Sequence, residues 1–142
     1  MALAKTYTVG DVGGVRRLDN LTGAWNDVPV TNTIPAIAGA LLLDVETDPN
    51  DGDKVFVVGE GNLQNNIFGI YVSTNGGTSW YVPGGNYQTN ADPQGSLRWY
   101  EVYVLDSLNI FVAGENGYIA ISNDGGLTFN LSTQLQIGRA HV

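Results

Sequence analysis

Three acidic residues each follow a glycine along the chain, and they are the first candidates for chemistry. The pairs are Gly10-Asp11, Gly59-Glu60 and Gly114-Glu115. If these pairs occupy equivalent corners of repeated units, Asp11, Glu60 and Glu115 would lie along one rim, where carboxylates attract a cation or a basic partner. The alternative is that they are solvated turn residues that match by ancestry. Turn chemistry favours the alternative, so all three remain candidate rim-binding residues only.

Other reactive side chains are sparse. The chain has no cysteine and therefore no thiolate nucleophile. Arg16, Arg17 and Arg98 are the arginines that precede the last six residues. Arg16 and Arg17 are adjacent on a predicted strand, so their side chains should point to opposite faces and cannot converge on one anion. We therefore predict no catalytic residues, no cofactor and no metal site. Residues 48–53, DPNDGD, lack the spacing of a calcium loop and predict a tight turn.

The composition favours a β-rich domain, and the net negative charge disfavours binding to anionic partners. The 142 residues are 43% hydrophobic and include 19 glycines, and no long stretch has helical periodicity. The net charge of −8 disfavours nucleic acid and anionic membranes as partners. Residues 36–43 form the longest apolar run, which is too short to span a bilayer. No secretory leader is recognisable, so we expect a soluble protein of the cytoplasm or of a virion.

Internal repetition is the strongest signal in the sequence. The octet SNDGGLTF (Ser122 to Phe129) repeats STNGGTSW (Ser73 to Trp80) at an offset of forty-nine residues. Upstream, FVAGE from Phe111 repeats FVVGE from Phe56 at an offset of fifty-five. The two offsets differ by six residues, which corresponds to a six-residue loop insertion at residues 63–68 of the earlier copy. Insertions of this kind belong at surface connections.

Each copy is predicted to contain four short strands separated by turns. In the second copy they are Leu41–Glu46, Lys54–Gly59, Gly69–Ser73 and Ser79–Pro83. A degenerate first copy spans residues 6–25, with Trp25 fifty-five residues before Trp80, and it lacks the innermost strand that would precede Tyr7. The predicted units are residues 6–30, 40–84 and 97–133.

The octets resemble the Asp-box, the bacterial neuraminidase repeat with the pattern Ser-x-Asp-x-Gly-x-x-Trp. This repeat occurs in sialidases, in sortilin-type receptors and in propellers similar to photosystem II assembly factors. The matching residues here are Ser73, Asn75, Gly77 and Trp80, and Ser122, Asp124, Gly126 and Phe129. The resemblance implies an all-β fold, a β-propeller fragment of about three four-stranded antiparallel blades. We expect each box to be structural, with its terminal aromatic packed against its own sheet.

The resemblance to sialidases also implies an arginine triad, a tyrosine nucleophile with a carboxylate partner and an acidic general acid. Three arginines in this arrangement cannot supply such a triad, and the Arg-Ile-Pro signature is absent. We therefore expect a non-catalytic binding or scaffold module with a protein-interaction, assembly or virion-structural role. The alternative is a fragment of a sialidase-like glycoside hydrolase whose catalytic residues lie in missing blades. The sequence does not decide between a protein partner and a glycan partner.

The last six residues, IGRAHV (137–142), match one reading frame of a widely used sequencing-library adapter that is followed by a stop codon. We expect residues 137–142 to be a non-native tail, so that the partial propeller occupies residues 1–136 and His141 takes no part in function. An arc of three units leaves two faces uncovered. We therefore expect the chain to self-associate.

Overall fold

The chain folds into three antiparallel β-sheets. The computed structural model describes residues 6–10, 14–19, 21–37, 40–61, 68–89 and 98–132. The first sheet contains β1 (Tyr7–Val9), β2 (Val15–Leu18) and β3 (Trp25–Asp27). The second contains β4 (Leu42–Asp48), β5 (Asp51–Gly59) and β6 (Ile70–Ser73). The third contains β7 (Trp99–Val104), β8 (Ile110–Gly114), β9 (Ile119–Ser122) and β10 (Asn130–Leu131).

The only helical segments of the described residues are short 3₁₀ turns. They are η1 (Val30–Asn32), η2 (Pro35–Ile37), η4 (Asn86–Thr89) and η5 (Glu115–Gly117). The prediction of an all-β protein without substantial helix is therefore confirmed.

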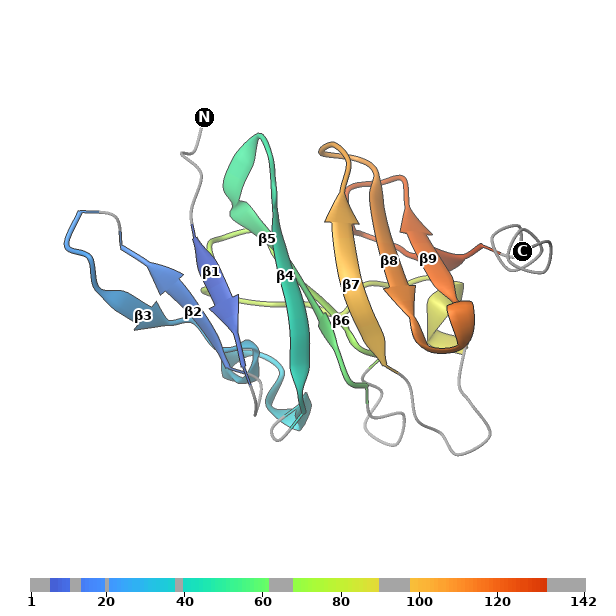
Figure 1. Cartoon of the computed structure of the whole chain (residues 1–142), viewed down its shortest axis with the longest axis horizontal. Coiled ribbons are helices and arrows are strands. Elements are labelled where there is room, and N and C mark those ends of the chain that lie inside the picture. The colour runs from blue at the N-terminus through green and yellow to red at the C-terminus, as the bar shows by residue number, and fades with distance from the viewer. Residues whose placement is uncertain are drawn as a thin grey trace.

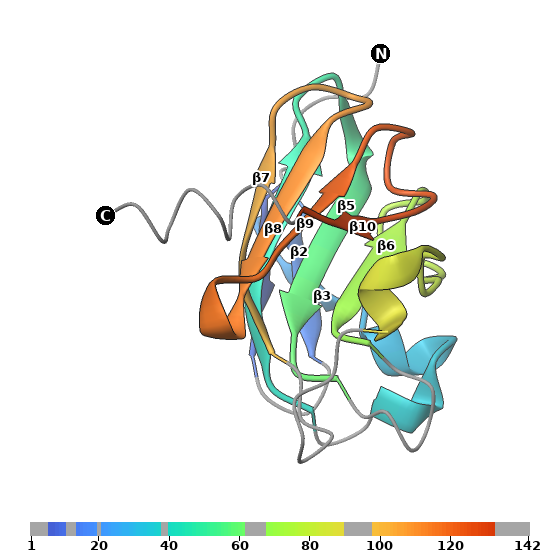
Figure 2. The same ribbon diagram turned by 90° about the vertical axis from the view of Figure 1, so that its right-hand side faces the viewer.

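The three sheets fan out from a shared inner edge formed by β1, β4 and β7 (Figure 1). In Figure 1 the first and third sheets extend to opposite sides of β4, and Figure 2 shows β5 and β6 of the second sheet extending behind it. Hydrogen bonds join neighbouring sheets near this edge. Leu42 N–H donates to Gly10 O at 3.3 Å, and Val102 N–H donates to Asp44 Oδ2 at 3.0 Å.

Strand pairing repeats from sheet to sheet with the offsets seen in the sequence. Pairs at matching offsets join the third and fourth segments of each unit: Arg17–Asn26 in the first sheet, Val72–Tyr81 in the second and Ile121–Asn130 in the third. A register shift also recurs between the first two strands, at Leu42/Asp44 and at Trp99/Glu101. Residues related by these offsets are called equivalent below.

The first sheet has no inner strand among the described residues, as the sequence predicts. One hydrogen bond closes the hairpin after the second strand in each unit: Gly10 N–H to Gly14 O, Gly59 N–H to Gly69 O, and Gly114 N–H to Tyr118 O. β1 is therefore equivalent to β5 and β8, which are second strands. The neighbours of β5 and β8 on the inner side are β4 and β7, and β1 has no counterpart of these.

The fourth strand of the second sheet differs from the prediction. Instead of a strand over Ser79–Pro83, the segment pairs with β6 at the single bridge Val72–Tyr81. Pro83 limits this pairing, because it has no N–H to donate to a ladder. The N–H and C=O of Trp80 point away from β6 and bond to Thr33 Oγ1. Within the described residues, the third sheet is the one that has all four strands.

Two apolar clusters hold the sheets together, one on each face of the second sheet. Towards the third sheet, Phe56 and Val72 pack with Trp99, Val112 and Phe129, all of which are fully buried. Towards the first sheet, a second cluster contains residues of β1, β2, β5 and β6 together with the segment after β3. Because both of its faces are covered, β5 is apolar from Val55 to Val58 without the alternation of a half-exposed strand.

Candidate functional site

The inner edge of β1 is the feature of this fold best suited to bind another chain. Among the described residues no strand pairs with this edge. On the other edge, Leu18 N–H donates to Thr6 O and Gly10 N–H donates to Gly14 O, so residues 6 and 8 and the N–H of Gly10 face β2. Backbone groups alternate along an antiparallel strand. The N–H and C=O groups of Tyr7 and Val9 therefore point towards the open edge.

Both ends of β1 are fixed to the second sheet, so the open edge is held in an extended conformation. The Tyr7 hydroxyl donates to Gly52 O at 2.8 Å in a buried hydrogen bond. Burial raises the pKa of the Tyr7 hydroxyl, which therefore stays protonated as a donor at neutral pH. At the other end, Gly10 O accepts from Leu42 N–H. An edge that is already ordered loses less conformational entropy when a partner strand is added.

Two hollows flank β1. One, of about 470 Å³, is lined by Thr8, Val9 and Gly10 of β1 and its turn, and by Arg16, Asp27 and Pro29. The other, of about 230 Å³, lies between β1 and β4 and is lined by Thr6, Tyr7, Val45, Glu46 and Thr47. Side chains of an added strand would alternate between the two sides of the sheet, so each side has a hollow to receive them.

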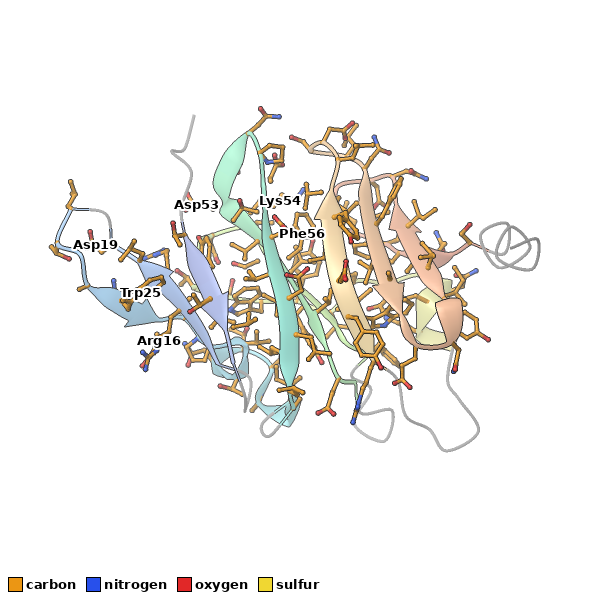
Figure 3. All side chains as sticks on the ribbon, in the orientation of Figure 1. Arg16, Asp19, Trp25, Asp53, Lys54 and Phe56 are labelled. Carbon is orange, nitrogen blue, oxygen red and sulfur yellow. The ribbon has the colours of Figure 1, made fainter. Side chains whose placement is uncertain are left out.

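Charged groups differ between the two hollows. In the larger one, Arg16 Nε lies 3.1 Å from Asp27 Oδ1, and both side chains are well exposed. Figure 3 shows Arg16 and Trp25 on this outlying sheet. In the smaller hollow, Glu46 is the charged residue of the lining. Partial burial, with a further contribution from Asp44, raises the pKa of the Glu46 carboxyl. A cation beside Glu46 would offset both effects.

Hydrogen bonds within the turn, several of them to the predicted Asp-box residues, fix the segment from Ser73 to Trp80. Ser73 Oγ accepts from Gly77 N–H at 2.9 Å and donates to Asn75 Oδ1 at 2.9 Å. Asn75 Oδ1 also accepts from Ser79 N–H at 2.9 Å. Gly77 has a φ of 90°, a conformation that side chains disfavour. These hydrogen bonds order the turn.

The turn from Ser122 to Phe129 repeats the same contacts. Ser122 Oγ accepts from Gly126 N–H at 2.8 Å and donates to Asp124 Oδ1 at 2.8 Å. Asp124 accepts from Thr128 through both N–H and Oγ1, at 3.0 and 2.6 Å. The Thr128 hydroxyl, followed by the Thr128 N–H, lowers the pKa of the Asp124 carboxyl.

Each terminal aromatic packs in a cluster that contains residues of its own sheet and of the preceding sheet. Trp80 Nε1 donates to Gly77 O of its own turn at 3.1 Å and to Val28 O beside the first sheet at 3.2 Å. Phe129 is fully buried in the cluster between the second and third sheets. Trp25, at the equivalent position of the first unit, is 44% exposed. The two box aromatics therefore join neighbouring units.

The two rim candidates among the described residues, Glu60 and Glu115, have different surroundings. Glu60 Oε1 accepts from Leu41 N–H at 2.9 Å, and its Oε2 lies 3.0 Å from Arg98 Nη2. Glu115 lies in η5, and its Oε1 is buried without a hydrogen-bond partner. Asp11 lies outside the described residues. Within the described ranges, no group of three or more His, Cys, Asp or Glu side chains could hold a metal ion.

The three arginines have separate partners. Arg16 pairs with Asp27 in its own sheet, whereas Arg17 Nη1 donates to Gly76 O of the second sheet at 2.9 Å. Arg98 pairs with Glu60. The guanidinium groups do not face a common position. None of the helical segments in the described residues is long and apolar enough to cross a membrane.

Comparison with known proteins identifies the fold. No protein-family model matches the sequence, and no curated protein matches it. The structure is similar to YCF48 bound to D1 peptide, with a TM-score of 0.58 and 13% sequence identity. The match covers 83% of this chain and 33% of the YCF48 chain, so this chain spans a third of the length of that protein. The three sheets form a β-propeller fragment.

The sequence indicates the open edge by one signal, the predicted lack of an innermost strand in the first copy. What it could not show is that the edge is fixed at both ends. The bond from Tyr7 to Gly52 joins residues 45 positions apart, and no local pattern marks such a contact.

Proposed function

We propose that the chain is a non-catalytic β-propeller module that binds a protein partner by accepting an extended segment along β1. The observation that carries this proposal is an ordered strand whose inner edge is open and whose two ends are fixed to the neighbouring sheet. Addition of a strand to an exposed sheet edge is a recurrent mode of peptide recognition. In this mode main-chain hydrogen bonds supply affinity, and pockets for alternate side chains supply specificity.

The arrangement of neighbouring units supports this position for the partner. In the second and third sheets the strands equivalent to β1 are paired on their inner edge by β4 and β7. An added segment would occupy the same place beside β1. Its backbone would bond to Tyr7 and Val9, and its side chains would enter the two hollows.

Charge favours a segment with a basic side chain. Glu46 lines the hollow between β1 and β4, and the whole chain carries a net charge of −8. This charge would accelerate the approach of a basic segment. That YCF48 is found with a bound peptide supports a protein partner over a glycan. An assembly or structural role would follow from such binding.

A peptide with the sequence of β7 tests the proposal. The probe is RWYEVYVL, residues 98–105, followed by two lysines and a fluorescent label. By equivalence, Tyr103 of the probe should lie opposite Tyr7, as it lies opposite Phe111 in the third sheet. We expect saturable binding in fluorescence anisotropy. N-methylation of the probe at the Tyr103 amide should weaken binding about tenfold. N-methylation at the Val102 amide should have a smaller effect, because that N–H points away from β1.

The protein itself offers a matched pair of variants. Val9→Pro removes an N–H that points to the open edge, a position where proline is tolerated in edge strands. It should weaken probe binding about tenfold. Leu21→Ser changes a 98% exposed side chain that lines neither hollow and leaves the edge hydrogen bonds intact, so affinity should stay within about twofold. Equal affinity for Val9→Pro and the wild type, or binding of sialylated glycans without any probe binding, would contradict the proposal.

A further inference from the structure

Two asparagines of this chain directly precede a glycine, at Asn75-Gly76 and at Asn116-Gly117. An asparagine in this setting can lose ammonia without an enzyme, because the backbone nitrogen of the next residue attacks the side-chain carbonyl carbon. Glycine hinders that attack least, since it has no side chain and its backbone turns easily. The structure gives the two asparagines very different surroundings, and the surroundings decide which one reacts in the folded protein.

The carboxamide of Asn75 is held by hydrogen bonds on both of its polar atoms. Its Oδ1 accepts from the Ser73 hydroxyl and from Ser79 N–H, both at 2.9 Å. Its Nδ2 donates to Ser79 Oγ at 2.8 Å. Turning the carbonyl carbon of Asn75 towards the next backbone nitrogen would break at least one of these bonds, which costs free energy.

The backbone that follows Asn75 is also fixed, by contacts with two different sheets. Gly76 N–H donates to Asp53 O of the second sheet at 2.8 Å, and Gly76 O accepts from Arg17 Nη1 of the first sheet at 2.9 Å. A Cβ atom at Gly76 would lie 2.6 Å from Arg17 Nη1 and 3.0 Å from Asp53 Oδ1, so the backbone is closely surrounded. The nitrogen that would attack the Asn75 carboxamide is therefore occupied.

Asn116 lies in η5, at the corner between β8 and β9, and has none of these restraints. Its side chain is exposed, and no hydrogen bond among the described residues involves its carboxamide. Among those residues it is also the one non-glycine residue with a positive φ, 59°. This left-handed conformation is costly for a residue with a side chain, although asparagine adopts it more readily than most.

We propose that Asn116 is a site of spontaneous deamidation in the folded protein, whereas Asn75 is protected until the chain unfolds. In the reaction, the Gly117 nitrogen gives up its proton and bonds to Asn116 Cγ. A five-membered succinimide ring closes, and the side-chain nitrogen leaves as ammonia. Water then adds to one of the two ring carbonyls and opens the ring to aspartate or to isoaspartate. One water is consumed and one ammonia is released, so no oxidant or reductant is needed.

Either product changes the corner between β8 and β9. Both add a negative charge next to Glu115, whose Oε1 is buried without a hydrogen-bond partner among the described residues. Isoaspartate also adds one carbon to the main chain of the corner. The corner is closed by Gly114 N–H to Tyr118 O at 2.9 Å and by Tyr118 N–H to Glu115 O at 3.1 Å. The longer main chain should weaken both bonds.

Peptide mapping by mass spectrometry tests the proposal, because deamidation makes a peptide about 1 Da heavier. In the folded protein at mildly alkaline pH, Asn116 should convert at least about tenfold faster than Asn75, a factor that the loss of a single hydrogen bond can supply. In urea the two rates should agree within about threefold, because the contacts are gone and both residues precede glycine. Equal rates in the folded protein, or no conversion of Asn116 while the unfolded chain reacts, would overturn the proposal.

Variants of the turn test the protection of Asn75. Ser79→Ala removes the acceptor of Asn75 Nδ2, so it should speed conversion of Asn75 about threefold or more and leave the rate at Asn116 unchanged. Thr78→Ala is the matched control, because it lies in the same turn and its side chain makes none of the Asn75 bonds. Near-ultraviolet circular dichroism checks that both variants fold. An unchanged Asn75 rate in folded Ser79→Ala would contradict protection by the turn, and a fast product that persists in Asn116→Gln would contradict the assignment to Asn116.

Discussion

At the scale of single residues, equivalent positions in neighbouring units can have different partners. Glu60 and Glu115 follow the same glycine corner, and both backbone N–H groups donate to the residue that precedes an inner strand. The Glu60 side chain also binds Leu41 N–H and Arg98, which joins the second sheet to the third. Glu115 Oε1 is buried and has no such partner. The two corners therefore share their backbone hydrogen bonds but differ in the partners of the glutamate side chain.

This pair gives a prediction about stability. Glu60→Ala should lower the free energy of unfolding by about 1–2 kcal/mol, because it removes a charge-assisted hydrogen bond and a partly exposed ion pair. Glu115→Ala should change the free energy of unfolding by less than about 0.5 kcal/mol or increase it, since an unpaired buried oxygen is removed. Urea denaturation of both variants measures the difference. Equal losses in the two variants would show that the Glu60 contacts contribute nothing.

At the scale of elements, the two glycine-rich turns set how closely the sheets approach. Gly77 and Gly126 have positive φ values, and each turn lies on the preceding unit. A Cβ atom at Gly77 would lie 2.6 Å from Val28 Cβ, just as one at Gly126 would meet Phe56. Glycine is therefore needed at these positions both for the backbone conformation and for the contact between sheets.

Alanine substitutions separate these two requirements. Gly23 has a φ of 73° and no atom within 4 Å of a built Cβ, so Gly23→Ala should cost about 1–2 kcal/mol from backbone strain alone. Gly126→Ala adds displacement of the Phe56 ring and should cost about 3 kcal/mol or more. Chemical denaturation provides both values. Equal losses in the free energy of unfolding for the two variants would show that the contact between Gly126 and Phe56 adds nothing.

Much of the element pattern could be predicted from the sequence, because turn residues and strand periodicity are local. The matched octets and the corner glycines both follow from residue order. The short fourth segment of the second sheet could not be predicted from alternation, since Pro83 lacks the N–H that would extend its pairing with β6. Trp25 is 44% exposed, and among the described residues no sheet precedes the first one to cover it.

At the scale of the whole molecule, the unpaired surfaces have different chemistry and suit different partners. The inner edge of β1 offers main-chain hydrogen bonds, and the face of the third sheet that is turned away from the second sheet offers apolar side chains. The face of the first sheet that is turned away from the second sheet offers neither. These properties come from long-range packing, so the sequence predicts that surfaces are left open but not which partner each one suits.

Among the described residues, both faces are covered in the second sheet alone, by the clusters that contact the first and third sheets. Its amide protons should therefore be replaced by deuterium only when the whole chain opens. The outlying sheets can detach with smaller loss of packing, so their amides should exchange sooner. Hydrogen–deuterium exchange followed by mass spectrometry would resolve this order, with peptides from β5 and β6 the slowest. Equal rates in all three sheets would mean that the units open together.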